Sequence, residues 1–449
     1  MNASGAVALS QLADIAGEAN IIRDRTQLVA YQIDGESPSA AVRPGSAEEV
    51  AEIVKFARRE RLALVATGAR TKLEMGMPPR RYDFALDMTR LDRVVAYDPG
   101  DLTLSVEAGT PLRRIAAELA AHGQFLPLEV PFADRATAGG TVASGVDSPL
   151  RQAYGTARDF VLGMEFVTGD GVAAKSGGRV VKNVSGYDIH KLMIGSLGTL
   201  GVITRINFRT FPLPRTTRTL MAAFRGSPSA CAFRKAIAQS VLRPRSLDIL
   251  RLRAHAGVSF EKDRWLVAVS FSGDGKVLER DQRELKILAE DSGGSSLESF
   301  VELQGDAETN TTRFISNFPV AIREPAPWAA IFKISTLPTE LVEVARALES
   351  IQMPWVVLMR GLGVAYLALM PTDGSEGSLR ALKQECARIF GLAGRPPWRH
   401  VTLAWCPAAL KSEIDVWGPL PADFPLMKKL KAVFDPGEVL SPGRFVGGI

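Results

Sequence analysis

The first regular pattern along the chain is an amphipathic helix over residues 46–60. Its apolar positions recur at helical spacing on one face: Val50, Ile53, Val54 and Ala57. Ser46 and Glu49 have the spacing of a capping box, which marks the start of the helix. An apolar run at 62–66 follows directly and predicts a buried strand. The stretch therefore predicts a helix that packs its apolar face close to the next strand.

Short strands with one helix among them are expected in the following residues. The strand-like runs are 84–88, 94–97, 102–107, 161–167 and 172–175. The helix is expected at 111–121, because Pro111 can start it and Gly123 can end it. The segment 195–204 leads into a further β-rich run that ends near Phe211.

Two prolines and a change of pattern divide the chain. Pro212 and Pro214 mark a boundary. Beyond it, strand-like runs at 265–271 and 356–370 and a helix-like run at 340–349 predict a separate α+β domain without glycine clusters. The expected division is a helical lead-in at 1–39, a first domain at 40–214, a second domain at 215–405 and a C-terminal segment at 406–449.

Composition agrees with a globular protein of more than one domain. At 449 residues the chain exceeds the size at which a single core usually keeps growing. Apolar residues make up 46% and charged residues 23%, which is ordinary for such proteins. The net charge of +5, from 54 basic and 49 acidic residues, is small for this length. Together with the lack of a nucleic-acid motif, it argues against nucleic acid as a partner.

The cysteines and the apolar segments predict a cytoplasmic protein. Cys231, Cys386 and Cys406 are too far apart for a disulfide framework, an iron–sulfur cluster or a zinc site. The N-terminus lacks the basic segment and apolar run of a signal peptide. The most apolar stretch, 356–370, is too short to span a bilayer and contains Arg360. Any attachment to a membrane is expected to be made through partner proteins.

Three glycine-containing loops carry the clearest chemical signal: 67–72, 137–145 and 195–201. Backbone N–H groups alone can hold a pyrophosphate if the chain approaches it closely, and a Cβ would obstruct that approach. A single loop of this kind usually just turns the chain. Three such loops within one domain-sized stretch, each joined to an apolar strand, indicate a phosphate-containing ligand.

A Rossmann fold is the obvious alternative for a glycine-rich phosphate site. Its fingerprint is a strand, then Gly-x-Gly-x-x-Gly, then a helix. Gly195, Gly198 and Gly201 have the wrong spacing, and the β-branched run at 202–206 predicts a strand after them. The Rossmann interpretation therefore fails.

The order of these segments resembles the FAD-binding domain of the vanillyl-alcohol-oxidase-like (PCMH-type) flavoproteins. The matching segments are RPGSAEEVAEIVKFARRERLALVATGART at 43–71, VEAGTPL at 106–112, TAGGTVASG at 137–145 and GGRVVKNVSGYDIHKLMIGSLGTLGVIT at 177–204. The ending LSPGRF at 440–445 also matches. Within the family, the chain most resembles the smaller FAD-binding subunit of the bacterial glycolate oxidase complex.

The resemblance implies an α+β fold in which a PCMH-type FAD-binding domain of two α+β subdomains occupies 40–214. It implies a cap-like second domain and a C-terminal segment that returns to the flavin domain. The residues that it assigns to non-covalent FAD are Thr67, Gly68, Ala69, Arg70, Thr71, Thr137, Ala138, Gly139, Gly140, Gly198, Thr199, Gly201, Val202 and Arg444. By the resemblance, residues 67–71 and 138–140 would line the pyrophosphate. Residues 198–202 would lie along the rest of the cofactor.

The chain departs from the family at two places. Ala69 and Arg70 stand where glycine is common, and Ser441 stands where relatives often have asparagine. Arg70 is expected either to face an anion or to be a solvated loop arginine.

Catalytic residues cannot be assigned from the sequence. Relatives that act on 2-hydroxy acids have clustered histidines, often around a metal, whereas the four histidines here are scattered: His122, His190, His255 and His400. We therefore expect no metal site. Arg360 could face a substrate carboxylate or point to solvent from an edge strand, and Tyr187-Asp188 is expected to hold a loop.

By resemblance, the chain is expected to be an FAD-containing subunit of a glycolate-type 2-hydroxy-acid dehydrogenase complex. Its expected partners are a larger FAD-binding catalytic subunit and an iron–sulfur subunit. A self-sufficient FAD-dependent dehydrogenase of a hydroxy acid or alcohol is the first alternative. A mainly structural or electron-relay flavin subunit is the second.

Overall fold

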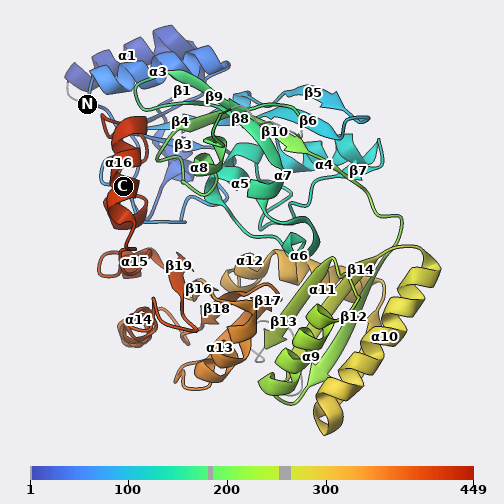
Figure 1. Ribbon diagram of the computed structural model, residues 1–449. Helices are drawn as coiled ribbons and strands as arrows, with labels where there is room; N and C mark the ends of the chain where they lie inside the picture. The colour runs from blue at the N-terminus through green and yellow to red at the C-terminus, as the bar shows by residue number, and fades with distance from the viewer. Residues whose placement is uncertain (1–2, 181–185, 252–263) are drawn as a thin grey trace. The chain divides into compact units, whose positions relative to one another are not determined.

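The computed structural model describes residues 3–180, 186–251 and 264–449, which form two compact units (Figure 1). The first unit contains Met1–Val146, Thr156–Leu213 and Leu420–Ile449, and the second contains Asp147–Gly155 and Pro214–Pro419. Sheets and helices are mixed in both units, so the α+β class expected from the sequence is confirmed.

The two units differ from the expected division at two points. Residues 147–155, placed in the first domain by the sequence, belong to the second unit. Residues 406–419, expected to accompany the C-terminal segment, also belong to the second unit, and only 420–449 returns to the first. The Leu403 N–H donates to the Val416 carbonyl at 2.7 Å, which ties residues 406–419 to the sheet of the second unit.

The first sheet of the first unit has the strand order β1-β2-β4-β3. Its strands are β1 (Ile21–Ile22), β2 (Ala40–Val42), β3 (Leu64–Thr67) and β4 (Phe84–Asp87). β1 and β2 are antiparallel, whereas β4 is parallel to both β2 and β3. Leu440 extends the sheet by a parallel bridge to Leu64, so the C-terminal segment lies beside β3.

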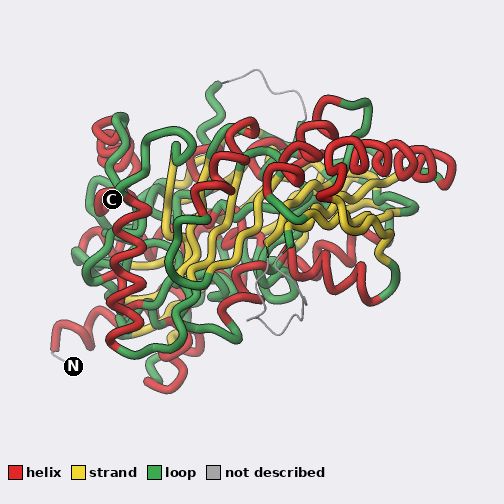
Figure 2. The backbone as a smooth tube through the Cα atoms, turned by 90° about the horizontal axis from the view of Figure 1, so that it is seen from below, coloured by secondary structure: helices red, strands yellow, loops and turns green. Residues whose placement is uncertain are grey.

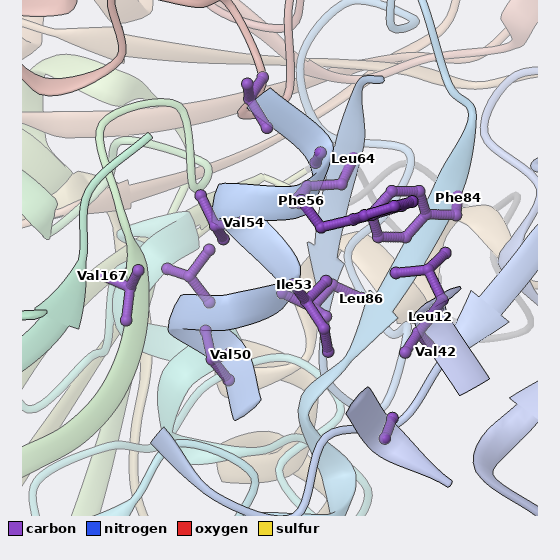
Figure 3. Close-up of a cluster of buried hydrophobic side chains, with 14 of the residues drawn as sticks. Leu12, Val42, Val50, Ile53, Val54, Phe56, Leu64, Phe84, Leu86 and Val167 are labelled. Carbon is purple, nitrogen blue, oxygen red and sulfur yellow. The ribbon is translucent and has the colours of Figure 1, made fainter. Parts of the chain in front are cut away.

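Helix α3 (Ala47–Arg59) packs its apolar face on this sheet. Ser46 accepts a hydrogen bond from the Glu49 N–H at 3.2 Å, but the Glu49 carboxylate accepts from Gly45 rather than from Ser46 as the capping box predicts. Figure 3 shows Phe56 and Ile53 directed toward Phe84 and Leu86 of β4. Full burial of a side chain of this size stabilises the fold by roughly 1.5–3 kcal/mol.

The second sheet of the first unit is antiparallel, with the order β5-β6-β10-β8-β9. Its strands are β5 (Val94–Asp98), β6 (Thr103–Glu107), β8 (Val161–Val167), β9 (Ala173–Gly177) and β10 (Val202–Arg209). A short pair, β7 (Gln124–Phe125) with β11 (Phe211–Pro212), lies outside it. The remaining helices of this unit are α1 (Ala3–Ala16), α2 (Arg25–Leu28), α4 (Leu112–Ala120), α5 (Ala138–Ser144), α7 (Ala157–Phe160), α8 (His190–Met193) and α16 (Phe424–Phe434).

The segment 137–145, expected to be a loop, contains the helix α5. Thr137 caps its start and Gly145, at φ 59°, ends it in the left-handed region. Small residues allow this helix to lie against β6, because a Cβ on Gly139 would come within 2.7 Å of the Ala108 Cβ. Glycine here serves close packing of a helix as well as approach to a ligand.

The second unit is built on one antiparallel sheet of eight strands, with the order β15-β12-β14-β13-β17-β18-β16-β19. These strands are β12 (Thr217–Phe224), β13 (Ser246–Arg251), β14 (Trp265–Ser272), β15 (Leu297–Leu303), β16 (Ala330–Ser335), β17 (Trp355–Arg360), β18 (Val364–Leu369) and β19 (His400–Trp405). Figure 2 shows the strands in yellow and the helices in red. Its helices are α6 (Arg151–Tyr154), α9 (Ser227–Gln239), α10 (Gly275–Gly293), α11 (Asp306–Ser316), α12 (Phe318–Arg323), α13 (Leu341–Leu348), α14 (Glu376–Phe390) and α15 (Ala408–Lys411).

The apolar run 356–370 forms a hairpin rather than one strand. β17 and β18 pair antiparallel, and Gly363, at φ 90°, makes the turn between them. The turn requires glycine, because a Cβ there would also collide with the Thr336 carbonyl. Among the described residues, no helix is long and apolar enough to cross a membrane.

Candidate functional site: a pocket in the first unit

A pocket in the first unit brings together most of the residues that the sequence assigned to FAD. Three segments and one C-terminal side chain line it: the loop after β3, helix α5, the segment 197–203 and Arg444. The predicted residues among the lining are Thr67, Gly68, Ala69, Arg70, Thr71, Thr137, Gly139, Gly140, Gly198, Gly201, Val202 and Arg444. Ala138 and Thr199 are fully buried beside it and do not line it.

The loop after β3 lines the pocket with residues whose backbone N–H groups have no acceptor in the described protein. Among the described residues, no protein group accepts a hydrogen bond from the N–H of Ala69, Arg70, Thr71 or Lys72. The Thr67 hydroxyl, in a residue that is 4% exposed, also lacks a partner there. Donors left unpaired along a pocket suit an anion, because native structures rarely leave buried N–H groups without an acceptor. The loop therefore has the donor set that a pyrophosphate requires.

Arg70 lines the pocket and is paired with a carboxylate of the protein, so it is not a solvated loop arginine. Its backbone is left-handed, at φ 60°, which explains why glycine is common at this position in relatives. Its guanidinium donates from Nη1 to Asp87 Oδ2 at 2.9 Å and lies 4.5 Å from the centre of the Tyr31 ring. The Tyr31 hydroxyl donates to the same oxygen of Asp87 at 2.5 Å. The Arg70 side chain is thus an anchor that fixes the loop to β4 and to the N-terminal segment.

Helix α5 brings its glycine backbone to the pocket, but the N–H groups at its start are already hydrogen-bonded within the protein. The Ala138 N–H donates to the Thr110 carbonyl at 2.9 Å, and the Gly139 N–H donates to the Ala108 carbonyl at 2.7 Å. The Gly140 N–H makes a long bond of 3.4 Å to the Thr137 hydroxyl. Contrary to expectation, Ala138 and Gly139 therefore have no N–H to offer a pyrophosphate.

The segment 197–203 turns sharply at the pocket before β10 begins. Leu197 and Gly198 both have positive φ, 52° and 72°. A Cβ on Gly201 would come within 3.1 Å of the Phe166 ring and 3.2 Å of the Met193 sulfur, so glycine allows the chain to pass close to β8. The Thr199 hydroxyl donates to the Ser196 carbonyl at 2.8 Å and stabilises the turn from inside.

Arg444 closes the pocket from the C-terminal segment. Its Nη2 donates to the carbonyls of Leu73 and Met75, at 2.7 and 2.6 Å, and its own carbonyl accepts from the Met77 N–H at 3.1 Å. Burial lowers the pKa of Arg444 to about 10, so the guanidinium remains charged at neutral pH. Arg444 therefore supports the far end of the loop whose near end Arg70 anchors.

Two further residues of the site were missed in the sequence. Lys72 lines the pocket with 9% exposure, and burial lowers its pKa to about 8. Its signal was present, because it is the last residue of the predicted loop 67–72. Tyr31 gave no signal, since it lies in a lead-in far from any glycine motif.

In the second unit, Arg360 is already paired. Its Nη1 donates to Asp248 Oδ1 at 2.7 Å, Asp147 Oδ2 lies 3.6 Å from its Nε, and Nη2 donates to the Ile315 carbonyl at 3.2 Å. The Arg360 side chain is 6% exposed. Both sequence expectations for it, a free carboxylate-binding cation and a solvated edge arginine, are therefore wrong, because two buried carboxylates compensate its charge.

The histidines lie apart in the described structure. His190 Nδ1 is 3.1 Å from the Ser176 hydroxyl, and burial lowers the pKa of His190. His122 packs edge-on against Tyr97, and His400 begins the edge strand β19. His255 lies outside the described residues. Within the described ranges, no three His, Cys, Asp or Glu side chains are grouped as metal ligands.

The predicted dipeptide Tyr187-Asp188 lies at the surface. The Tyr187 side chain is 90% exposed, and its carbonyl accepts a hydrogen bond from the Ser176 hydroxyl. Asp188 pairs with Lys191 at 2.7 Å, which lowers the pKa of the carboxyl. These contacts fit the loop-holding role expected from the sequence.

Comparison with known proteins supports the assignment of the pocket to FAD. Residues 38–177 match the model of the FAD binding domain family. Glycolate oxidase subunit GlcE of Escherichia coli strain K12 is 42% identical over 38% of this chain and 48% of that protein. The chain thus aligns with about half of that subunit. Glycolate oxidase subunit GlcD of Bacillus subtilis strain 168 is 24% identical over 97% of this chain and 95% of that protein.

The fold is also that of a solved structure. p-Cresol methylhydroxylase with substrate bound superposes with a TM-score of 0.78 at 14% identity, covering 99% of this chain and 97% of that one. Residues 38–177 thus form an FAD-binding domain, and the chain is similar to glycolate oxidase subunits. FAD is the cofactor of this flavoprotein. The unpaired N–H groups of residues 69–72 and the glycines along the pocket fit its pyrophosphate.

Proposed function

We propose that this flavoprotein is the FAD-containing subunit of a glycolate-type 2-hydroxy-acid dehydrogenase complex. As an oxidoreductase acting on CH–OH groups, it would pass electrons on to partner subunits. The observation that carries the proposal is the pocket, because its unpaired N–H groups lie within residues 38–177, which match the FAD binding domain family. Other relatives are named for D-lactate and D-2-hydroxyglutarate, which are also 2-hydroxy acids.

When bound, FAD supplies the acceptor for the hydride that leaves the hydroxy acid. The chain's own residues hold the cofactor. The N–H groups of residues 69–72 and the Thr67 hydroxyl would bind the pyrophosphate, and the backbone around Gly140, Gly198 and Gly201 would lie along the rest of FAD. Arg70 and Arg444 keep the binding loop in place through the contacts described above.

The proposed partners are a larger FAD-binding catalytic subunit and an iron–sulfur subunit, in a cytoplasmic complex. Cys231, Cys386 and Cys406 are buried in the second unit and form no disulfide, and the described residues offer no set of thiolates for a cluster. The histidine cluster of relatives that act on 2-hydroxy acids also has no counterpart among the described side chains. Electron output would therefore depend on another subunit.

The decisive experiment compares the isolated chain with the complex. The absorbance spectrum of the purified chain should show a bound flavin. The chain alone should reduce an artificial dye slowly with glycolate or D-lactate, and co-expression with the two partner subunits should restore fast reduction. Rapid dye reduction by the flavin-loaded single chain would reject the subunit role. A purified chain without flavin would reject the site itself.

A self-sufficient dehydrogenase is the second candidate, because the match to GlcD of Bacillus subtilis extends over nearly the whole of both chains. The two candidates differ in the first half-reaction. Under anaerobic conditions, glycolate or D-lactate should bleach the flavin of the isolated chain only if the chain binds and oxidises the substrate itself. If the flavin of this chain is not bleached in the complex either, a structural or electron-relay role is favoured.

A further inference from the structure

Lys72 is a buried cation without an anionic partner in the described structure. It is the last residue of the pocket-lining loop 67–72, and it is 9% exposed. Its Nζ donates to the Thr71 hydroxyl at 3.3 Å and lies 5.9 Å from the centre of the Phe132 ring. Among the described residues, no carboxylate forms an ion pair with it.

Burial is the cause of the lowered pKa of Lys72, and the other cations of the loop and of the Phe132 ring have partners of their own. Arg70 is paired with Asp87, Arg444 is held by two carbonyls, and Arg135 stacks on the Phe132 ring at 5.2 Å. Burial of an ammonium away from a counter-ion is costly, and the effect appears as a lowered pKa of Lys72, to about 8. A protein keeps such a group where a ligand supplies the missing charge.

We propose that the Lys72 ammonium is the counter-ion of the FAD pyrophosphate in this pocket. This inference rests on the proposed function, because it takes FAD as the ligand. The four N–H donors of residues 69–72 bring dipoles to the pyrophosphate but no net charge, whereas Lys72 brings a full charge at the end of the same loop. The family resemblance did not assign this residue, since glycine loops bind phosphate without a side chain.

The proposal predicts how the FAD affinity depends on pH, because binding is coupled to the protonation of Lys72. In the empty pocket Lys72 loses its proton as the pH rises through about 8. An anion at the ammonium raises that pKa, so above pH 8 binding takes up a proton. The FAD affinity should therefore be constant below pH 8 and should fall above it, by at most about tenfold per pH unit.

The test measures the dissociation constant of FAD from the quenching of flavin fluorescence at several pH values between 7 and 9.5. Lys72→Met should weaken FAD binding on the order of 10- to 100-fold at pH 7. It should also abolish the pH dependence above 8. Lys72→Arg should retain binding at pH 7 and should lose the pH dependence, because arginine does not titrate in this range. Lys175→Met, at an exposed position on β9, is the matched control and should change neither.

Two ligand fragments identify which part of FAD is paired. ADP carries the diphosphate without the flavin, and its competition with FAD should weaken in Lys72→Met. Riboflavin carries the flavin without phosphate, and its binding should be unchanged. Equal loss of riboflavin affinity would place Lys72 at the flavin ring and overturn the proposal.

Folding is separated from binding by thermal unfolding of the FAD-free protein. Removal of an uncompensated buried charge should leave the Tm of Lys72→Met equal to or above that of the wild type, while the rise in Tm on adding FAD should shrink. Unchanged FAD affinity in Lys72→Met, with the wild type binding FAD, would overturn this inference alone. A wild-type chain that binds no FAD would overturn the proposed function and the inference together.

Discussion

The ammonium nitrogen of Lys431 lies 2.9 Å from the carbonyl oxygen of Thr199, which is 232 positions earlier in the sequence. The same ammonium donates to the Leu440 carbonyl at 2.9 Å and to Asp435 Oδ2 at 2.7 Å, and Lys431 is 8% exposed. The buried ammonium of Lys431 therefore links helix α16 to the turn at 197–203 and to Leu440, which lies beside β3.

Lys431→Met should destabilise the protein by roughly 3–5 kcal/mol, because it leaves the buried Asp435 carboxylate without its cation. The turn at Thr199 would also lose an anchor, so FAD affinity should fall. Urea unfolding and flavin fluorescence measure the two effects. Lys429→Met, at an exposed position on the same helix, should change the unfolding free energy by less than about 0.5 kcal/mol. Equal stabilities of the two variants would show that the buried contacts contribute little.

Arg70 combines a left-handed backbone with an ion pair, and two substitutions separate these effects. Arg70→Ala loses the pair with Asp87 and keeps the strained backbone, whereas Arg70→Gly loses the pair and relieves the strain. The glycine variant should therefore be more stable than the alanine variant by roughly 1–2 kcal/mol, measured by chemical denaturation. Both should bind FAD more weakly than the wild type, because the loop has lost its anchor. A glycine variant with full FAD affinity would show that the anchor is unnecessary.

Gly198→Val tests the turn at the pocket. The position has φ 72°, and the nearest atom to an added Cβ is the Ser441 hydroxyl oxygen at 3.7 Å, so backbone strain is the main effect expected in the empty protein. We expect destabilisation of roughly 1–3 kcal/mol and loss of bound FAD, seen in the absorbance at purification. Gly377→Val, on α14 in the second unit, has no atom within 4 Å of its added Cβ and should keep its FAD. Stoichiometric FAD in Gly198→Val would mean that the site is misplaced.

Non-covalent binding of FAD is a further prediction. The residues that line the pocket include no histidine, cysteine or tyrosine that could attach the flavin, and the three cysteines are buried in the second unit. Burial raises the pKa of Cys231 to about 12, which keeps its thiol unreactive at neutral pH. Precipitation with acid should release the yellow colour into the supernatant. Flavin fluorescence that stays with the denatured band on a gel would contradict this prediction.

The parts of the site that the sequence predicted are those that depend on local backbone geometry. Gly198 needs its positive φ, and Gly139 needs room beside Ala108, so both leave a glycine in a recognisable order of segments. The sequence could not show that the N–H of Gly139 is already bonded to the Ala108 carbonyl. That bond depends on how α5 meets β6, which is a tertiary contact.

Long-range side-chain contacts were also beyond sequence reasoning. Tyr31 meets Asp87 56 positions later, and Arg360 meets Asp248 112 positions earlier. Neither pair follows a periodic pattern, because each depends on which strands become neighbours. For the same reason residues 147–155 were assigned to the first domain, although Asp147 is buried next to Arg360 in the second unit.

The Arg444 contact with the Leu73 carbonyl spans 371 positions, and it sets an order of events during synthesis. The ribosome makes the loop after β3 early and must then complete the whole second unit before Arg444 emerges. At about 5–20 residues per second, the nascent loop waits roughly 20 to 70 seconds for that anchor. Cofactor loading onto a fully anchored loop is therefore expected only after Arg444 has been synthesised.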